Sequence, residues 1–185
     1  MIRQRRFMFF AGALLIFCNY ALSYAGTLPA TGQRKCYNAK GNVIACAGTG
    51  QDGAHIVQPK SYTDNGDGTV TDNVTGLMWQ KQDAGNKRTW VEAGAYCTNL
   101  SIGEHTDWRL PTKKKLMSLV DYGIPYPGPT INPTYFPNAH ASAYWSSTAG
   151  ADHAGYAWVV YFDDGYVGYA GKSINGYVRC VRGGK

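Results

Sequence analysis

Apolar and polar residues alternate through the last third of the chain, as expected for antiparallel strands with one buried face. The alternation predicts strands over residues 144–147, 156–162, 166–169 and 176–181, with a turn at Asp163-Asp164-Gly165. Over 156–162, however, both sides of the strand carry large apolar groups. One side is therefore expected to form core, and the other to lie under loops or to offer an exposed aromatic surface.

A second strand region is predicted over residues 61–81, where residues that tolerate tight turns separate β-branched runs. The spacing of Asp64, Asp67 and Asp72 in this region also suggests a calcium site. Aligning Gly68 with the glycine of an EF-hand loop puts a threonine at the first ligand position and a valine at the last, so that motif fails. Turn chemistry explains these residues without a metal. We therefore predict no cofactor, with calcium as the alternative.

Two helices are predicted between these strand regions. Thr89-Trp90-Val91-Glu92 is a capping box, and it begins a helix whose inner face carries Cys97. Thr112 is placed to cap a second helix, which is expected to end near Gly123. The apolar positions of the second helix are Leu116, Met117, Leu119 and Val120. Lys113, Lys114 and Lys115 crowd its first turn, either as a solvated face or as a site for anions.

The segment from 121 to 143 contains five prolines, so it can form neither a long helix nor a central strand. Just before the second helix, Asp107-Trp108-Arg109-Leu110-Pro111-Thr112 predicts an extended approach and a sharp corner. We interpret this corner as a structural motif that presses the helix onto the core, with direct contact to a ligand as the alternative.

Residues 1–25 have the pattern of an export signal: a basic start, an apolar run over 7–17 and the cleavage-like site Ser23-Tyr24-Ala25. We predict cleavage after Ala25, with an uncleaved membrane anchor as the alternative. Residues 26–60 are rich in Gly, Thr, Gln and Ala and predict a tethered arm, followed by one domain over 61–185. The location is then periplasmic, on the outer surface or secreted.

Charge argues against nucleic acid as a partner. The formal charge is +6, but removing Arg3, Arg5 and Arg6 with the signal leaves 15 basic against 12 acidic residues, or +3. Contact with a membrane is expected only through an uncleaved signal. After Asp164 no acidic residue follows, so the predicted final strands combine aromatic rings with a local positive field.

Four cysteines remain after the signal, which allows three pairings of two disulfides. Cys36 and Cys46 flank the good turn Lys40-Gly41-Asn42, so a stapled hairpin is the local solution. This leaves Cys97 with Cys180. A zinc site is the competing interpretation, but the chain has no C-x-x-C pair.

Ordered motifs from about Ser61 to Arg182 resemble the Lcl C-terminal domain family, named for the end domain of a bacterial collagen-like adhesin. The motifs are Asp64-Asn65-Gly66-Asp67-Gly68-Thr69-Val70-Thr71-Asp72, Thr75-Gly76-Leu77-Met78-Trp79, Asp107-Trp108-Arg109-Leu110-Pro111-Thr112, Tyr144-Trp145-Ser146-Ser147-Thr148 and Val178-Arg179-Cys180-Val181-Arg182. The lysines after Thr112 depart from the acidic residue usual there in the family.

The resemblance implies an α+β fold similar to C-type lectins and to formylglycine-generating enzymes. In such a fold two short helices pack on twisted antiparallel sheets, a long proline-rich loop region faces the ligand, and a disulfide ties the first helix to the last strand. The motifs of calcium-dependent sugar binding in C-type lectins, Glu-Pro-Asn or Gln-Pro-Asp with Trp-Asn-Asp, do not occur in this chain.

These observations favour an exported, non-catalytic binding module, an adhesin-type domain for acidic or sulfated glycans. Tyr and Trp would stack on sugar faces, and Lys and Arg would meet sulfate or carboxylate groups. The candidate ligand residues are Lys113, Lys114, Lys115, Trp145, Tyr166, Tyr169, Lys172 and Arg182.

Two other functions are alternatives. The domain could be a structural component of a surface assembly whose partner is another surface protein. It could also be a formylglycine-generating-type enzyme, which in its aerobic form binds copper through a cysteine pair. Here each mature cysteine has a predicted disulfide partner, and no catalytic constellation is evident in the sequence. We therefore predict no enzymatic activity.

Overall fold

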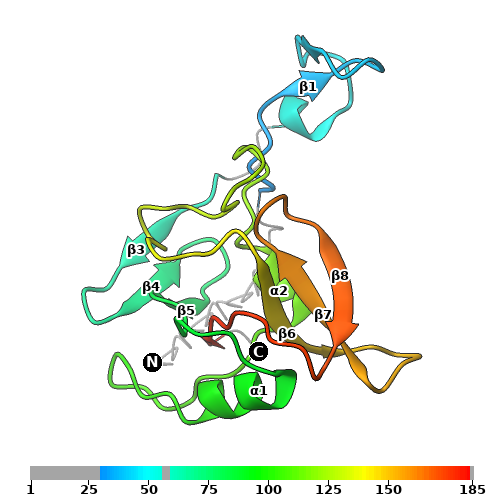
Figure 1. Cartoon of the computed structure of the whole chain (residues 1–185). Coiled ribbons are helices and arrows are strands. Elements are labelled where there is room, and N and C mark those ends of the chain that lie inside the picture. Colours follow the sequence, from blue (N-terminus) through cyan, green and yellow to red (C-terminus); the bar gives the residue numbers. More distant parts are fainter. Residues whose placement is uncertain (1–29, 56–58, 184–185) are drawn as a thin grey trace, which may run out of the picture.

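The computed structural model describes residues 30–55 and 59–183. In chain order its elements are β1 (Cys36–Tyr37), β2 (Val43–Ile44), the 3-10 helix η1 (Asp52–Ala54), β3 (Tyr62–Asp64), β4 (Thr69–Asp72), β5 (Met78–Gln80), α1 (Trp90–Thr98), α2 (Lys113–Met117), β6 (Ala143–Ala149), β7 (Tyr156–Tyr161), β8 (Val167–Gly171) and β9 (Val181–Arg182) (Figure 1). This part of the chain is α+β, as predicted. The predicted signal, residues 1–25, lies outside it, and no helix within it is long and apolar enough to cross a membrane.

The strand region predicted over residues 61–81 supplies three strands of an antiparallel sheet with the order β3-β4-β5-β9. In the turn between β3 and β4, Gly66 and Gly68 have φ of 79° and 87°, which side chains with a Cβ rarely adopt. The distant strand β9 pairs with β5, with Trp79 opposite Val181. The sheet therefore joins the beginning of the domain to its end.

The alternating pattern after residue 143 forms a second antiparallel sheet, with the order β6-β7-β8. One face carries Tyr144 and Val160, which pack with α2. The opposite face carries Trp145 and Val159, which pack in a cluster with residues of α1. Both faces of this sheet therefore contribute to the core, because two helices from an earlier part of the chain cover them.

The segment from 176 to 182 runs between the two sheets and bonds to both. Its backbone exchanges hydrogen bonds with Gln80, Ala84, Arg88, Arg109, Ala143 and Trp145. The Val178 and Cys180 side chains are fully buried. Because these backbone partners come from both sheets, the loop before α1 and the corner at 107–112, the segment fastens these parts into one body.

Helix α1 begins at the predicted capping box. The Thr89 side chain accepts the backbone N–H of Glu92, and the Glu92 carboxylate accepts the N–H of Thr89 at 2.9 Å. Cys97 points inward and forms a disulfide with Cys180, with the two Cα atoms 5.5 Å apart. The helix is thus fixed at its start by the cap and near its end by the crosslink.

The structure corrects two expected boundaries. Helix α2 ends at Met117 rather than near Gly123, because the backbone N–H of Asp121 bonds to Thr130 in the proline-rich segment instead of continuing the helix. Of its predicted apolar positions, Met117 is exposed. The strand predicted over 176–181 is reduced to β9, because the residues before Val181 bond in turn to Arg88, to β6 and to the loop after β5 instead of to one neighbouring strand.

We expect the Cys97–Cys180 disulfide to supply a large part of the stability of the domain. Replacing both residues by alanine removes a crosslink across 83 residues, so the free energy of unfolding should fall by about 4 kcal/mol. Urea unfolding followed by tryptophan fluorescence measures this change. The matched control is the Cys36→Ala, Cys46→Ala variant, which opens only the arm and should leave the midpoint unchanged; equal midpoints for both variants would contradict the assignment.

Candidate functional site

The corner at 107–112 is hydrogen-bonded to both sheets. The Trp108 indole is buried and donates to the carbonyls of Ile102 and His105, at 3.3 and 3.0 Å. The Arg109 backbone exchanges hydrogen bonds with Val181, and the Pro111 carbonyl accepts the N–H of Ser147 at 2.7 Å. The motif therefore joins the start of α2 to both sheets, which supports its interpretation as a structural corner.

Arg179 and Asp83 form the centre of a buried polar cluster. The Arg179 guanidinium donates through Nη1 to the carbonyls of Gln80 and Lys81, at 2.7 and 2.5 Å, and its Nη2 lies 3.9 Å from the Asp83 carboxylate. Asp83 also accepts the Tyr144 hydroxyl and the backbone N–H of Gly85. These bonds hold the loop after β5 against the C-terminal segment.

Burial sets the protonation chemistry of this cluster. Desolvation raises the pKa of the Tyr144 phenol, and the neighbouring Asp83 carboxylate raises it further. Burial lowers the pKa of Arg179, while Tyr144 and Asp83 oppose that shift. His140 stacks on the Tyr177 ring and lies 3.9 Å from Asp83 at the edge of the cluster. Because Arg179 bonds to the carbonyls of Gln80 and Lys81, and Asp83 accepts the Tyr144 hydroxyl, the cluster serves the fold.

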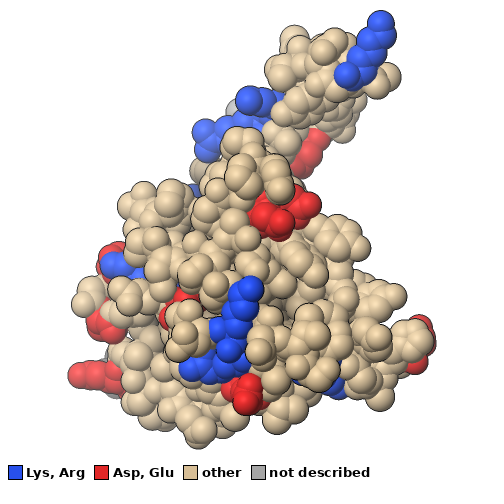
Figure 2. Space-filling view, viewed as in Figure 1, with Lys and Arg blue, Asp and Glu red and all other residues tan. Residues whose placement is uncertain are grey.

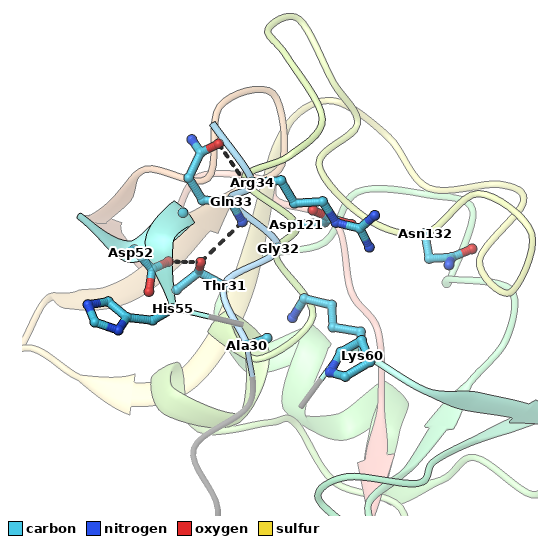
Figure 3. Close-up of a pocket in the computed structure, with 12 residues that line it drawn as sticks. Ala30, Thr31, Gly32, Gln33, Arg34, Asp52, His55, Lys60, Asp121 and Asn132 are labelled. Atoms are coloured by element: carbon cyan, nitrogen blue, oxygen red, sulfur yellow. Dashed lines mark hydrogen bonds between the residues drawn. The ribbon is translucent and has the colours of Figure 1, made fainter. Parts of the chain in front are cut away.

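A hollow of about 470 Å³ lies where the arm meets the body (Figure 3). Lys60 and Arg34 line it together with Asp52 and Asp121. Lys60 donates to the Ser118 carbonyl, and burial lowers the pKa of its ammonium group, with Asp121 opposing the shift. Charges of both signs face this hollow, so it offers no uniform field for an anionic ligand.

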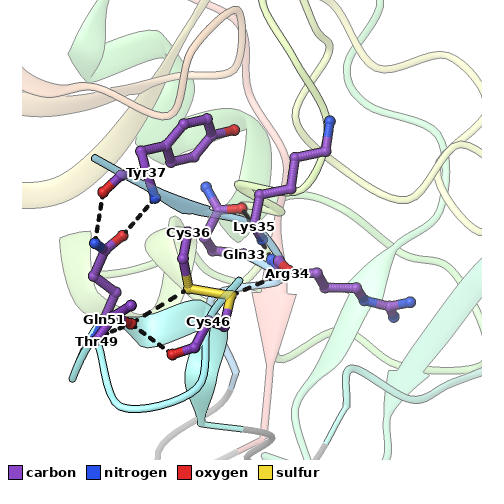
Figure 4. The surroundings of a disulfide bond; sticks show 8 residues. All are labelled: Gln33, Arg34, Lys35, Cys36, Tyr37, Cys46, Thr49 and Gln51. Atoms are coloured by element: carbon purple, nitrogen blue, oxygen red, sulfur yellow. Dashed lines mark hydrogen bonds between the residues drawn. A yellow bond between two sulfur atoms is a disulfide. The ribbon is translucent and has the colours of Figure 1, made fainter. Parts of the chain in front are cut away.

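The arm itself is a small unit with its own internal bonds (Figure 4). The Cys36–Cys46 disulfide joins its hairpin, as expected. The Gln51 amide accepts the N–H of Tyr37 at 2.9 Å and donates to its carbonyl at 2.7 Å, as a neighbouring strand would. The outer edge of β1 is thereby covered, and the arm projects from the body (Figure 1).

Exposed aromatic rings gather on the sheet face that α2 covers in part. Tyr156 and Trp158 of β7 lie on this face, and Tyr169 of β8 stands opposite Trp158. The Lys113 ammonium, from the first turn of α2, lies 3.4 Å from the centre of the Trp158 ring. The Tyr156 and Tyr169 side chains are 43% and 57% exposed. We call Lys113, Tyr156, Trp158 and Tyr169 the aromatic–lysine surface.

A second lysine–tryptophan pair stands at the end of the same sheet. The Lys172 ammonium lies 4.3 Å from the centre of the Trp90 ring and donates to the Ala154 carbonyl at 2.7 Å. The Trp90 indole in turn donates to the Ser146 carbonyl at 2.8 Å. On the face shown in Figure 2, Lys and Arg side chains form small separate groups on a mostly uncharged surface. The placement of lysine side chains on aromatic rings therefore distinguishes the surface of this protein more clearly than its net positive charge does.

The structure separates the predicted ligand residues into different places. Trp145 is fully buried, and its indole donates to the Arg88 carbonyl, so we withdraw it from the candidates. Arg182 lies away from the aromatic–lysine surface and forms an ion pair with Asp107 at 2.6 Å. Tyr166 is 63% exposed but packs on Tyr161. Only Lys113 and Tyr169 of the predicted set meet on one surface, while Lys114 and Lys115 follow Lys113 in α2.

Sequence reasoning missed Tyr156 and Trp158 as members of this surface. The alternation along β7 did suggest that one side of the strand would either lie under loops or offer an exposed aromatic surface. The alternation could not show that helix α2 would end before it covered Tyr156 and Trp158. The length of that helix leaves the end of the sheet uncovered.

The three aspartates considered for calcium cap their own turns. Asp64 accepts the Gly66 N–H and pairs with Lys81, and Asp72 accepts the N–H groups of Val74 and Thr75. Asp67 accepts both the N–H and the hydroxyl of Thr69. Among the described residues, no group of three or more acidic, histidine or cysteine side chains is placed to hold a metal ion.

A family model described as the Lcl C-terminal domain matches residues 68–182, which include both sheets from β4 onward, both α-helices and the Cys97–Cys180 crosslink. The chain belongs to the Lcl C-terminal domain family. Membership indicates a domain associated with the cell surface, and the two disulfides indicate an oxidising, extracytoplasmic environment. A search of curated proteins finds no match to the chain.

We expect the buried Arg179 to be essential for the stability of this Lcl C-terminal domain. Arg179→Met would leave two carbonyls and the Asp83 carboxylate without their cationic partner, at a cost of about 3–5 kcal/mol in the free energy of unfolding. Chemical unfolding measures the loss. Lys87→Met removes an exposed charge from the same region and should change stability by less than about 0.5 kcal/mol; similar values for both variants would contradict the assignment.

The exposed Asp107–Arg182 pair gives the Lcl C-terminal domain a dependence on pH. Hydrogen bonds from Arg182 hold the pKa of Asp107 below its ordinary value. The pair therefore adds stability above the unfolded pKa and loses it as the pH falls through the lower folded value. Asp107→Asn should lower stability near neutral pH and have less effect in strong acid, as measured by urea unfolding. Asp152→Asn is the matched control, and the same pH dependence in both variants would refute this role.

Proposed function

We propose that this domain is an exported, non-catalytic binding module of the cell surface that holds acidic or sulfated glycans. The observation that carries the proposal is the aromatic–lysine surface. Its two most exposed rings, Tyr156 and Tyr169, lie on a sheet face beside the Lys113 ammonium. Aromatic rings bind the apolar faces of sugars, and ammonium groups bind sulfate or carboxylate.

The ring arrangement supports a carbohydrate ligand more than a flat aromatic one. Tyr169 meets Tyr156 edge to face, at 5.7 Å and 83°, and meets Trp158 at 5.8 Å and 74°. The rings therefore present faces in different directions and do not form one flat slot. A chain of sugar units, whose apolar faces also vary in direction, fits such a stepped surface.

We further infer that the fold is of the C-type-lectin-like kind. The Cys97–Cys180 bond joins α1 to the C-terminal segment, and a long proline-rich connection separates α2 from β6. Both features are those that the family resemblance implies for this fold. The ligand surface proposed here, however, lies on the β7–β8 hairpin beside α2, not in the proline-rich connection.

The disulfide-bonded state of the cysteines supports a binding function rather than a catalytic one. Cys97 and Cys180 are both fully buried and joined to each other, so neither offers a thiolate for copper. His105, His140 and His153 lie in separate loops, and His140 is engaged in a ring stack with Tyr177. A disulfide that fixes α1 to the core is consistent with a rigid domain that binds a ligand.

We expect the exported protein to be retained on heparin resin and to be released by salt, because screening weakens exposed charge contacts. The Lys113→Gln, Lys172→Gln variant should elute at lower salt, with a dissociation constant about tenfold higher, equivalent to about 1.4 kcal/mol. The matched control is Lys35→Gln, Lys40→Gln, which removes the same charge from the arm and should elute like the wild type. Equal elution of both variants would contradict a role for the lysines of the body.

A further inference from the structure

Lys113 occupies the face of Trp158 that a sugar would otherwise use. Its ammonium lies 3.4 Å from the ring centre, and its backbone N–H donates to the Thr148 hydroxyl at 3.0 Å. None of the ion pairs between described residues involves Lys113. The charge thus lies on an aromatic ring and is not neutralised by any carboxylate of residues 30–55 and 59–183.

Tyr169 offers the free ring next to this lysine. It stands directly across from Trp158 on the neighbouring strand, with the two rings in edge contact. Tyr169 is 57% exposed, whereas Trp158 is only partly exposed and Lys113 covers one face of its ring, so Tyr169 is the ring that is free for a sugar to stack on. The ammonium and the free ring are both neighbours of the same indole.

We propose that Lys113 and Tyr169 form a single subsite for one anionic sugar unit, with Trp158 as the positioning residue between them. This inference rests on the proposed glycan-binding function. The Tyr169 ring takes the apolar face of the sugar, and the Lys113 ammonium takes a sulfate or carboxylate on the same unit or the next one. A charge-assisted hydrogen bond is stronger than an exposed cation–π contact, so ligand binding draws the ammonium away from Trp158.

Nearby residues of the same types provide matched controls. Lys114 follows Lys113 in α2 and is exposed, and none of the cation–π contacts between described residues involves it. Tyr166 belongs to the same hairpin as Tyr169 and is more exposed, yet it packs on Tyr161, with ring centres 5.8 Å apart. A site built only from positive charge and exposed rings would use Lys114 and Tyr166 equally well. The subsite proposed here uses Lys113 and Tyr169, and it does not use Lys114 or Tyr166.

The test measures the affinity of the full exported protein for a heparin-derived hexasaccharide and for its chemically desulfated form by calorimetry. Lys113→Gln and Tyr169→Ser should each weaken binding of the sulfated probe about tenfold, while Lys114→Gln and Tyr166→Ser change it less than about twofold. Lys113→Gln should also reduce the preference for the sulfated form. Tyr169→Ser should weaken both forms by a similar factor, because stacking does not depend on sulfate. Thermal unfolding shows whether each variant is folded.

A nuclear magnetic resonance titration tests the movement of Lys113. In the free protein the Trp158 ring current should shift the side-chain protons of Lys113 upfield, and Trp158→Phe should reduce this shift. The sulfated probe should move these signals toward ordinary lysine values, and the desulfated probe should move them less.

The outcomes separate the two proposals. Suppose that the wild type binds the sulfated probe, but that the Lys113 and Lys114 variants bind it with equal affinity, or that the Tyr169 and Tyr166 variants do. This result would overturn the subsite and leave the glycan-binding function in place. No binding of the sulfated probe by the wild type would overturn the proposed function and the subsite with it.

Discussion

Residues 178–180 are buried, so every backbone N–H and carbonyl of this stretch requires a partner inside the protein. The segment from 176 to 182 forms backbone hydrogen bonds with both sheets, with the loop after β5 and with the corner before α2. Arg179 and Cys180 add a guanidinium bonded to two carbonyls and a disulfide to α1. The arrangement of the domain depends on this segment, because it joins β5, β6, α1 and the corner before α2.

One consequence is that the sheet β6-β7-β8 is fixed from both sides. Its α1 face is joined to the crosslinked helix, and its other face packs on α2, which is too short to cover the whole sheet. The uncovered end carries Tyr156 and Tyr169 on a rigid backbone. Rings held in this way lose little conformational freedom when a ligand binds, which suits them to recognition.

A second consequence concerns the basic residues near the C-terminus. As a group they suggest a positive field, but the structure uses Arg179 within the core and pairs Arg182 with Asp107. Lys172 remains at the surface on the Trp90 ring, just as Lys113 of α2 lies on the Trp158 ring. The charges available to a ligand are therefore fewer than the composition suggests, and aromatic side chains position them. The arm is separate from this surface and meets the body through a hollow of mixed charge.

The sequence by itself determined the features that depend on neighbouring residues. These include the capping box at Thr89, the turns at Gly66 and Gly68, the stapled hairpin of the arm and the strand alternation of β7. Each follows from backbone geometry and hydrogen bonding within a few residues. Only the tertiary structure decided that Trp145 is buried while Trp158 lies at the surface, and that α2 stops at Met117. Both tryptophans occupy aromatic strands, and their different burial depends on which distant helix packs on which face of the sheet.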